Sequence, residues 1–545
     1  MELFRRWIAS LAACLISAAM LGCGGGGGAD ATTPAAAPQV DTGWPLQAVQ
    51  GQGHITVYWA AQSAAQVYEV WVQEAGQSSA KLSRRLTATT STTATWVHTV
   101  TELTPDSSHR VWVRMLSASG AVQDSQVLER NTSRIAASGS ASEPSFMPSS
   151  IDTALLVIDT DGAAPIVDRD NYMTATFNLY ANSADRSAGL ALAAGRLELR
   201  GRGNTTWELH PKKPYRLKLA SSTSLLGMPA NRHWVLLANH SDKTLLRNQL
   251  AFEVSRRMGM PYTPRSQVVQ LQLNGQYLGS YDLVEHVRTG TSRVNIAALG
   301  SSAADDLAPL VSGGYLLEVD RNDAETRFVS STCGLPVRIH APESPSTAQL
   351  SYINQYLNQA EAALMSSNFA DPSTGYAAWI DVDNWVDWYL HSELMHHIDA
   401  FRHSTYLHKD RSGKLKMGPV WDFDLAMGNH LGYFSTRSGR TDGLGSASTR
   451  CWFARLLQDP AFVQRVRQRW ATLRGTSLSD LNAHVQTHAA LLTQSAQVNN
   501  FSRWPVLDRY LWQNVVVTGS YAGEIEYLQW WLQRRLQWMD EHWRP

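Results

Sequence analysis

The sequence predicts an α+β chain in which an all-β sandwich precedes a larger domain of two lobes. Short alternating apolar runs separated by turn residues, typical of antiparallel strands, fill residues 42–131. A segment rich in Ser, Ala, Pro and Gly, residues 132–150, is typical of a linker. Strand signals continue to about residue 320 and helical periodicity follows from about residue 346, which predicts a sheet-rich lobe over 151–320 and a helical lobe over 321–545.

Length and charge limit the class of protein. At 545 residues the chain is too long for one hydrophobic core, so two or three domains are expected. Lys and Arg together number 47, and so do Asp and Glu, so the charge balance gives no reason to expect nucleic acid as a partner. After the first 23 residues no apolar run reaches membrane-spanning length.

The N-terminus has the pattern of a secretory signal peptide. Arg5 and Arg6 precede an apolar run over residues 7–21. The Leu-Gly-Cys sequence that ends at Cys23 resembles a lipobox, which implies that the Cys23 thiol carries a lipid. The alternative is a cleaved signal without lipid. Residues 24–41, rich in Gly, Ala and Pro, predict a flexible tether. We therefore expect an exported bacterial lipoprotein at the cell envelope, on the periplasmic or cell-surface face, held to the membrane through Cys23 only.

The predicted sandwich has its clearest strands at residues 55–59, 67–72 and 110–114. Residues 103–109 resemble the corner of a fibronectin type III domain, with His109 at the usual Tyr position. This resemblance implies a spacer or docking module.

Two cysteines beyond the predicted signal peptide and lipobox are candidates for a disulfide. Cys14 lies inside the signal segment, and Cys23 is the lipidation candidate. Cys333 and Cys451 remain, and in an oxidising compartment they are able to pair. Their distance in the sequence leaves the pairing open.

A glycine-containing turn follows an alternating strand that begins at residue 197. It contains Arg200, Gly201, Arg202 and Gly203. Glycines in such a turn let backbone N–H groups approach an anion such as phosphate, and the two arginines add positive charge. A tight hairpin without a ligand is the alternative.

A lysine and a glutamate are candidates for an ion pair that holds phosphate. Residues 215–219 alternate, which places Lys218 on one face of a strand. The helical pattern that begins near Asp242 places Glu253 on its apolar face. Protein kinases use a strand lysine and a helix glutamate in this way. The alternatives are a solvated basic face for Lys218 and an ion pair with an arginine for Glu253.

Further strands are predicted at residues 267–273, 277–285 and 315–320, with the first two joined at Asn274 and Gly275 as a hairpin. Glu285 ends the second strand, and we expect it at a hinge between the lobes where adenine binds.

Carboxylates suited to phosphoryl transfer occur after residue 396. Such a reaction needs one carboxylate to accept the hydroxyl proton and others to hold magnesium. Asp399 follows a predicted helix and is the candidate base. Asp422 and Asp424 alternate on a short strand and are the candidate metal ligands.

The Arg-Gly-Arg-Gly-Asn turn, the Lys-Lys-Pro-Tyr-Arg strand and the Trp-Asp-Phe-Asp element, in this order, resemble the CotH kinase family of spore coat protein H-like secreted kinases. The resemblance covers residues 151–545. It implies an atypical, two-lobed protein-kinase-like fold that uses ATP with Mg²⁺ or Mn²⁺ to phosphorylate Ser or Thr of secreted or surface proteins. By this resemblance Lys218 binds phosphate, Asp399 is the catalytic base and Asp422 is a metal ligand.

One position departs from the family pattern. Where kinases generally place a metal-binding Asn, this chain has Ser404, and a hydroxyl is a poorer ligand for magnesium. His403 and Asp424 are the candidates to compensate.

The same residues bear on other functions. The sequence contains neither Gly-x-Ser-x-Gly nor His-Glu-x-x-His, which disfavours a classical hydrolase. His396 and His397 are adjacent and diverge on a helix, so one metal ion is a poor fit for both. Two alternatives stay open: a catalytically inactive kinase-like surface protein for adhesion or carbohydrate binding, and an ATP-using transferase of other chemistry, such as AMP transfer.

Overall fold

The computed structural model describes residues 44, 46–51, 54–87, 95–100, 103–104, 107–132, 146–321, 327–430, 439–445, 447–492, 495–511 and 514–544. The predicted signal peptide, the lipidation candidate Cys23 and the tether lie outside the described residues, as do residues 133–145 of the predicted linker.

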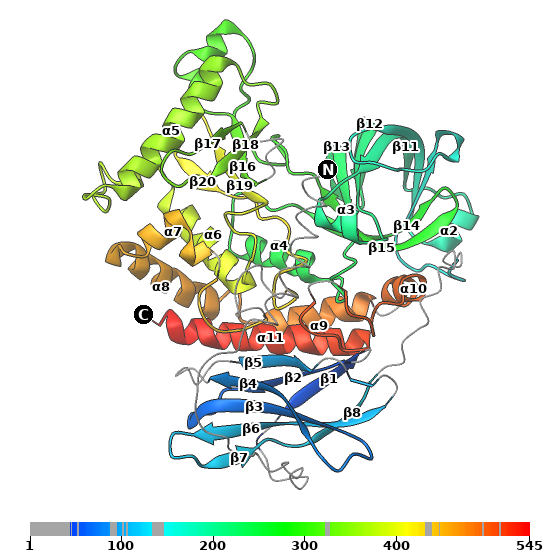
Figure 1. The fold of residues 1–545 in the computed structure, drawn as a ribbon. Coiled ribbons are helices and arrows are strands. Elements are labelled where there is room, and N and C mark those ends of the chain that lie inside the picture. The colour runs from blue at the N-terminus through cyan, green and yellow to red at the C-terminus, as the bar shows by residue number, and fades with distance from the viewer. Residues whose placement is uncertain are drawn as a thin grey trace, which may run out of the picture.

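The N-terminal part is an all-β sandwich of two antiparallel sheets, drawn in blue and cyan in Figure 1. One sheet has the order β1-β2-β5 and the other β4-β3-β6-β7, with β8 also paired to β6. The strands are β1 (Gln47–Gly51), β2 (His54–Ala60), β3 (Ala65–Glu74), β4 (Lys81–Thr87), β5 (Thr95–Val100), β6 (Ser108–Ser117), β7 (Val122–Asp124) and β8 (Leu128–Asn131). Ile55, Tyr68 and Val113 belong to the core between the sheets. His109 is buried, and its Nδ1 lies 3.2 Å from the carbonyl oxygen of Ser107, so this ring makes a local contact at the predicted corner.

The predicted sheet-rich lobe contains a closed barrel with the strand order β10-β11-β12-β13-β15-β14-β9. Its strands are β9 (Leu155–Thr160), β10 (Met173–Tyr180), β11 (Ala193–Gly201), β12 (Tyr215–Leu225), β13 (Met228–Leu237), β14 (Ser266–Leu273) and β15 (Gln276–Glu285). Alternate side chains such as Leu199, Leu217 and Trp234 point inward and fill the barrel. The short helices α2 (Ser183–Ser187) and α3 (Thr205–Leu209) lie between barrel strands in the sequence.

A second sheet lies outside the barrel and has the order β17-β18-β16-β19-β20. Its strands are β16 (Tyr315–Val319), β17 (Phe328–Val329), β18 (Pro336–Ala341), β19 (Thr405–Lys409) and β20 (Leu415–Met417). The strand expected at 315–320 is therefore present, but it pairs with β19 and β18 rather than with the barrel. The part predicted as a helical lobe is thus a mixture of helices and this sheet.

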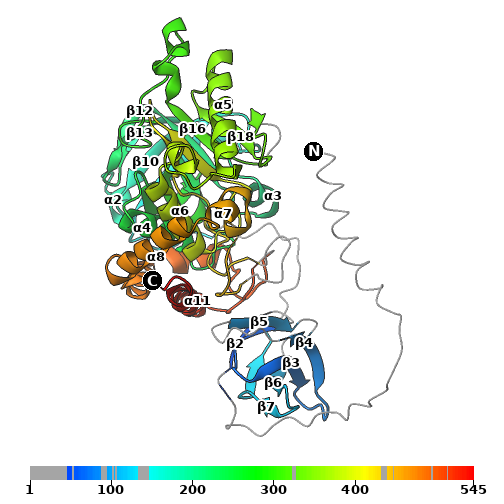
Figure 2. The same ribbon diagram turned by 90° about the vertical axis from the view of Figure 1, so that its left-hand side faces the viewer.

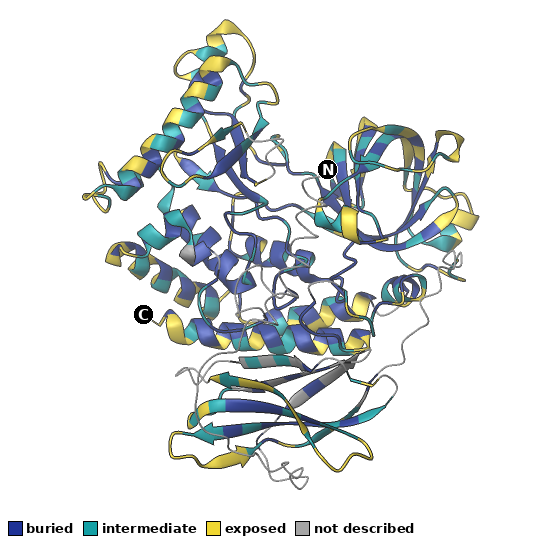
Figure 3. Cartoon of the chain, viewed as in Figure 1, coloured by how far each residue is buried: buried dark blue, intermediate teal, exposed yellow. Residues whose placement is uncertain are grey.

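The longer helices lie beside the second sheet, as α5 does, or below it and below the barrel in Figure 1. They are α4 (Arg247–Arg257), α5 (Thr347–Met365), α6 (Val382–Met395), α7 (Cys451–Leu456), α8 (Pro460–Gly475), α9 (Leu481–Leu492), α10 (Ala496–Arg503) and α11 (Tyr521–His542). Helix α6 is almost entirely buried, and the outer surfaces of α5 and α8 carry the exposed residues (Figure 3). Short 3-10 turns are η1 (Asp161–Ala163), η2 (Ala303–Asp306), η3 (Leu310–Ser312), η5 (Tyr376–Ala378) and η6 (Ala447–Thr449).

The barrel and the helical part have separate hydrophobic cores. The view in Figure 2, turned by 90° from Figure 1, shows the sandwich below both parts. Helix α4 lies between β13 and β15 in the sequence, but its apolar residues belong to the core of the helical part. Helix α10 ties that part back to the barrel, because Ser280 on β15 donates to the carbonyl oxygen of Ala496 at 2.6 Å. Among the helices of the described ranges, none is long and apolar enough to cross a membrane.

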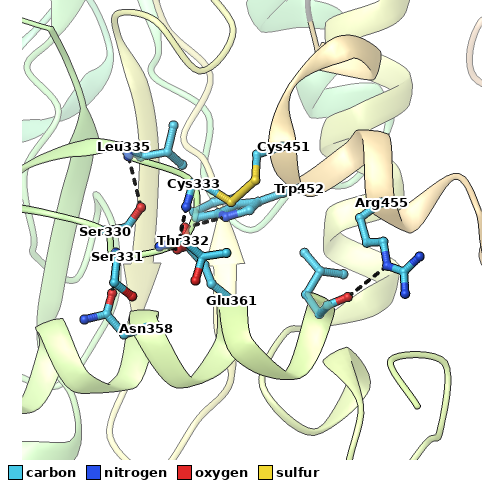
Figure 4. The surroundings of a disulfide bond; sticks show 11 residues. Ser330, Ser331, Thr332, Cys333, Leu335, Asn358, Glu361, Cys451, Trp452 and Arg455 are labelled. Carbon is cyan, nitrogen blue, oxygen red and sulfur yellow. Dashed lines mark hydrogen bonds between the residues drawn. A yellow bond between two sulfur atoms is a disulfide. The ribbon is translucent and has the colours of Figure 1, made fainter. Parts of the chain in front are cut away.

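Cys333 and Cys451 form a disulfide, which answers the question that the sequence left open (Figure 4). The bond joins the segment after β17 to the start of α7 across 118 residues of sequence. The buried carboxylate of Glu361 on α5 supports both sides, since it accepts from the backbone N–H of Cys333 at 3.1 Å and from Trp452 Nε1 at 2.8 Å.

Candidate active site

Asp399 lies in a compact turn directly after α6. The helix ends because His396 takes a left-handed backbone conformation with φ of 50°. The carbonyl oxygen of Asp399 accepts from the N–H groups of Arg402 and His403, at 2.7 and 3.0 Å, which closes the turn. The side chain is only 6% exposed, and its Oδ1 has no hydrogen-bond partner among the described residues. Burial, with the charge of Asp422 as the second cause, raises the pKa of Asp399 to about 7.

Asp422 lies beside this turn, but the short strand predicted for Asp422 and Asp424 does not form. Residues 418–423 are a loop that follows β20, because the left-handed backbone of Asp422 is incompatible with an extended strand. Asp422 has a left-handed φ of 71°, and its Oδ2 accepts from the Ser404 hydroxyl at 3.0 Å. Burial raises the pKa of both carboxyls, and the charge of Asp422 adds to the rise at Asp424. The charge of Asp399 also acts on Asp424, so the three carboxylates form one electrostatically coupled group. The segment is held in place from α4, because Asn248 Oδ1 accepts from the backbone N–H of Phe423 at 2.8 Å.

The residues fit a divalent cation that shares its ligands with a phosphate. Within the described ranges, no three His, Cys, Asp or Glu side chains are grouped closely enough to hold a metal by themselves. Mg²⁺ is commonly held by one or two carboxylates, with substrate phosphates and water completing the octahedron. Asp422 and Asp424 supply two such carboxylates, and burial raises the pKa of both. The Ser404 hydroxyl is beside Asp422 but is donating its proton to it.

His403 is oriented by a carboxylate on the second sheet. Its Nδ1 lies 2.7 Å from Oδ1 of Asp320, the residue after β16. Burial lowers the pKa of His403, but the hydrogen bond with Asp320 and the charge of Asp399 outweigh it, so the pKa is raised. Glu318 on the same strand pairs with His340 at 2.6 Å, and its charge raises the pKa of Asp422.

The glycine-containing turn reaches the carboxylates from the barrel. The Arg202 guanidinium lies 5.5 Å from the ring centroid of Trp421, the neighbour of Asp422. Its charge lowers the pKa of both Asp422 and Asp424, against the effect of burial. Gly201 is required by packing, because a Cβ there would come within 2.4 Å of the Trp207 ring.

The pair expected between Lys218 and Glu253 does not form. Lys218 Nζ instead binds Glu198 at 2.7 Å, because β11 and β12 place these two residues directly opposite each other. Glu253 binds Arg256 at 2.7 Å and Arg257 at 2.8 Å, its neighbours one turn along α4. The alternative of an arginine partner for Glu253 is therefore correct, and the helix face that carries it is not the fully buried one.

Glu285 ends β15 as predicted, but its carboxylate is occupied by protein donors. Tyr262, Arg265 and Arg293 all donate to it, with Tyr262 Oη at 3.0 Å and Arg265 Nε at 2.9 Å. The backbone N–H of Arg265 donates as well, at 3.0 Å. Because a carboxylate has about four acceptor positions, this side chain has none left for adenine.

The profile of the family described as CotH kinase protein matches residues 199–539. This chain belongs to the CotH kinase protein family. The match runs from β11 into α11 and includes every carboxylate of the candidate site. It confirms the resemblance drawn from the glycine-containing turn and the Trp-Asp-Phe-Asp element.

Several solved structures are also similar to parts of this CotH family member. A myokine structure is 14% identical, with 18% of this chain and 100% of that chain covered and a TM-score of 0.15. The solution structure of the fn3 domain of human contactin 1 is 18% identical, with 22% and 99% covered and a TM-score of 0.14. The structure of titin kinase and its flanking domains is 8% identical, with 46% and 37% covered and a TM-score of 0.14. No conclusion about fold or function follows from similarities at such TM-scores. Among curated proteins, none matches the chain.

Sequence reasoning missed two carboxylates of this CotH family site. Glu318 and Asp320 come from β16 and its end, far before Asp399 in the sequence. A signal was present, because an otherwise apolar strand that carries two carboxylates in alternation is unusual for a buried segment. Arg169 was also missed, and it donates to the carbonyl oxygen of Gly203 at 2.6 Å, which fixes the turn.

Proposed function

We propose that the chain is a phosphotransferase that moves the γ-phosphoryl group of ATP to Ser or Thr hydroxyls of secreted or surface proteins. One observation carries this proposal. Asp399 keeps a buried carboxylate oxygen without a hydrogen-bond partner among the described residues, beside the coupled carboxylates Asp422 and Asp424. A phosphoryl transfer site needs this separation of a base from metal-binding carboxylates.

Asp399 is the group that accepts the proton of the attacking hydroxyl. Its pKa of about 7 is well matched to general base catalysis near neutral pH. The closed turn holds the carboxylate in position, because its carbonyl oxygen is tied to the N–H groups of Arg402 and His403. The unpartnered Oδ1 is the atom that a substrate hydroxyl would approach.

Asp422 and Asp424 would hold Mg²⁺ or Mn²⁺, which when bound supplies positive charge to the phosphate oxygens. Ser404 orients Asp422 through its hydroxyl, and Asn248 fixes the segment through the N–H of Phe423. Arg202 adds a fixed cation at the same place from the barrel side.

The proposed fold is an atypical two-lobed kinase-like domain. The support is that the barrel and the helical part have separate cores, and that the glycine-containing turn comes from one and the carboxylates from the other. The atypical features are the strand order of the barrel and the presence of a second sheet. The turn that carries Asp399 leads directly into β19 of that sheet.

The proposed location is outside the cytoplasm, with a lipid on Cys23 as the anchor and a fibronectin type III-like sandwich as the spacer. The disulfide between Cys333 and Cys451 supports an oxidising compartment. The lipobox-like sequence around Cys23 supports the anchor.

The experiment compares label transfer from ATP carrying the label in its γ- or its α-phosphate, with Mg²⁺ or Mn²⁺, using protein without its signal peptide. Asp399→Asn and Asp422→Asn are expected to abolish transfer of the γ-label. Asp383→Asn is the matched control, since this carboxylate is 83% exposed and pairs only with Arg465 among the described residues. Transfer of the α-label would establish AMP transfer instead, and ATP binding without transfer of either label would establish an inactive kinase-like protein.

A further inference from the structure

A row of cations covers the outward surface of the barrel next to the carboxylates. On β12 the inward residues Tyr215, Leu217 and Leu219 fill the barrel core, so Arg216 projects outward. Directly opposite Arg216 in the register of β11 and β12 is Arg200. Like charges in directly opposed positions destabilise a sheet. The fold therefore keeps an arrangement that costs stability without a ligand.

Two histidines extend this row across β13 and the end of β15. The rings of His233 and His286 have centroids 6.4 Å apart, and each has a buried Nδ1 without a hydrogen-bond partner among the described residues. Burial lowers the pKa of His286, and the charges of Arg216, Arg288 and Arg202 lower it further. These charges show that the arginines surround the histidine closely enough to act on it.

Protein groups leave much of this positive charge uncompensated. Within the described ranges Arg216 and Arg202 have no carboxylate partner, and Arg216 Nε is buried without an acceptor. Arg200 donates to the carbonyl oxygen of Arg169, a neutral group, and faces the ring of Tyr172 at 5.0 Å. The carboxylates nearby are already bound to other groups. Asp168, on which the charge of Arg200 acts, accepts from the backbone N–H groups of Asp170 and Asn171. Glu198 holds Lys218 at 2.7 Å, and Glu343, which is 75% exposed, holds Arg288 at 3.1 Å.

The row and the carboxylates belong to one continuous site, because Arg202 acts on both. Its guanidinium lies 5.5 Å from the ring centroid of Trp421, the neighbour of Asp422, and its charge acts on Arg216 and His286 on the barrel side. Cations on the barrel thus face carboxylates on the helical part. A polyanion with a divalent cation complements both halves.

We infer that Arg200, Arg202, Arg216, Arg288, His233 and His286 form a cradle for the phosphate chain of a nucleoside triphosphate, with Arg216 at its centre. This inference rests on the proposed function and deepens it. In this cradle, arginines on neighbouring strands bind the phosphates. In protein kinases a lysine held by a helix glutamate has this role. Guanidinium groups bind phosphate oxygens in a bidentate manner, which suits a chain of adjacent phosphates.

The test measures binding of ATP and of inorganic tripolyphosphate by titration calorimetry, together with the melting temperature of each ligand-free variant. Arg216→Gln is expected to weaken the binding of both ligands about tenfold to a hundredfold, as for the loss of a hydrogen bond to a charged group. The melting temperature of ligand-free Arg216→Gln is expected to stay equal or to rise, because the repulsion by Arg200 is relieved. A purely structural role of Arg216 would lower it.

Arg196→Gln is the matched control. Arg196 lies on the same strand as Arg200, and Asp161 already neutralises it at 2.7 Å. Unchanged binding by Arg216→Gln, or an equal loss in Arg196→Gln, would overturn the cradle, and so would a parent protein that binds neither ligand. If tripolyphosphate binding depends on Arg216 while no label is transferred, the result supports the cradle and contradicts the proposed phosphotransferase activity. If label transfer depends on Asp399 but ATP affinity does not depend on Arg216, the result contradicts the cradle and supports the phosphotransferase activity.

Discussion

The Ser404 hydroxyl donates a 3.0 Å hydrogen bond to Oδ2 of Asp422, and both residues have a left-handed backbone, with φ of 52° and 71°. The two turns that carry the candidate base and the candidate metal ligand are therefore joined by one side-chain contact. By the resemblance drawn from the sequence, Ser404 takes the position where kinases generally have an Asn.

Ser404→Asn is expected to improve the use of magnesium. Asn tolerates a left-handed backbone better than most residues, and its amide is able to donate to Asp422 while its carbonyl oxygen binds Mg²⁺. We expect the Mg²⁺ concentration for half-maximal label transfer to fall about tenfold, the equivalent of one added ligand of modest strength. Ser404→Ala, which removes the bond to Asp422, is the control and should raise that concentration. An unchanged requirement in both variants would show that Ser404 does not support the metal.

Glu253→Gln is expected to leave the affinity for ATP unchanged within about twofold, because Glu253 binds Arg256 and Arg257 rather than a phosphate-binding lysine. The cost is expected in stability, at about 1 kcal/mol near neutral pH for two helix ion pairs. Calorimetric titration with ATP and urea denaturation measure the two quantities. A loss of ATP affinity of about tenfold or more would show that Glu253 turns to Lys218 when nucleotide binds.

The buried His391 makes the stability of the folded protein depend on pH. Burial lowers the pKa of His391 from 6.5 to about 4, although its hydrogen bond to the carbonyl oxygen of Ala251 at 2.8 Å opposes the shift. Between pH 6.5 and about 4, His391 is protonated in the unfolded chain but neutral in the folded protein. The free energy of unfolding therefore decreases as the pH falls through this range.

The variant His391→Gln lacks this titration. Its loss of stability relative to the parent should therefore be smaller by about 2 kcal/mol at about pH 5 than at about pH 7.5, and constant above that. Urea denaturation of both proteins at each pH measures the difference. A difference that does not vary with pH would show that folding leaves the pKa of His391 unchanged.

Removing the disulfide is expected to destabilise the domain strongly. The bond between Cys333 and Cys451 closes a loop with a sequence separation of 118, and the chain-entropy treatment gives about 5 kcal/mol for loops of this size. The double variant Cys333→Ser/Cys451→Ser and the parent under reducing agent should show the same lower stability in urea. If the parent is insensitive to reducing agent while the double variant is destabilised, the loss comes from packing around Trp452 rather than from the bond.

The sequence by itself predicted the features that depend on local pattern. Alternation predicted the clearest strands of the sandwich and part of the barrel, namely β11, β12, β14 and β15, and a Gly-containing turn with two arginines was recognisable as a candidate anion site. Asp399 after a helix was predicted as a candidate base, and Asp422 with Asp424 as candidate metal ligands, although the short strand expected for these two does not form. These features need only neighbours in the chain, so no knowledge of the fold is required to read them.

Tertiary structure decided every partner. Lys218 is bound to Glu198 and Arg216 is opposite Arg200 because of the register of β11 and β12, which no local pattern defines. The strand at 315–320 joined the second sheet, where it brings Glu318 and Asp320 to the carboxylates. The pairing of Cys333 with Cys451 likewise depended on how α5 and α7 pack. Contacts between segments far apart in the chain depend on how the whole domain packs. These contacts determine which charged side chains of the site are paired and which are not.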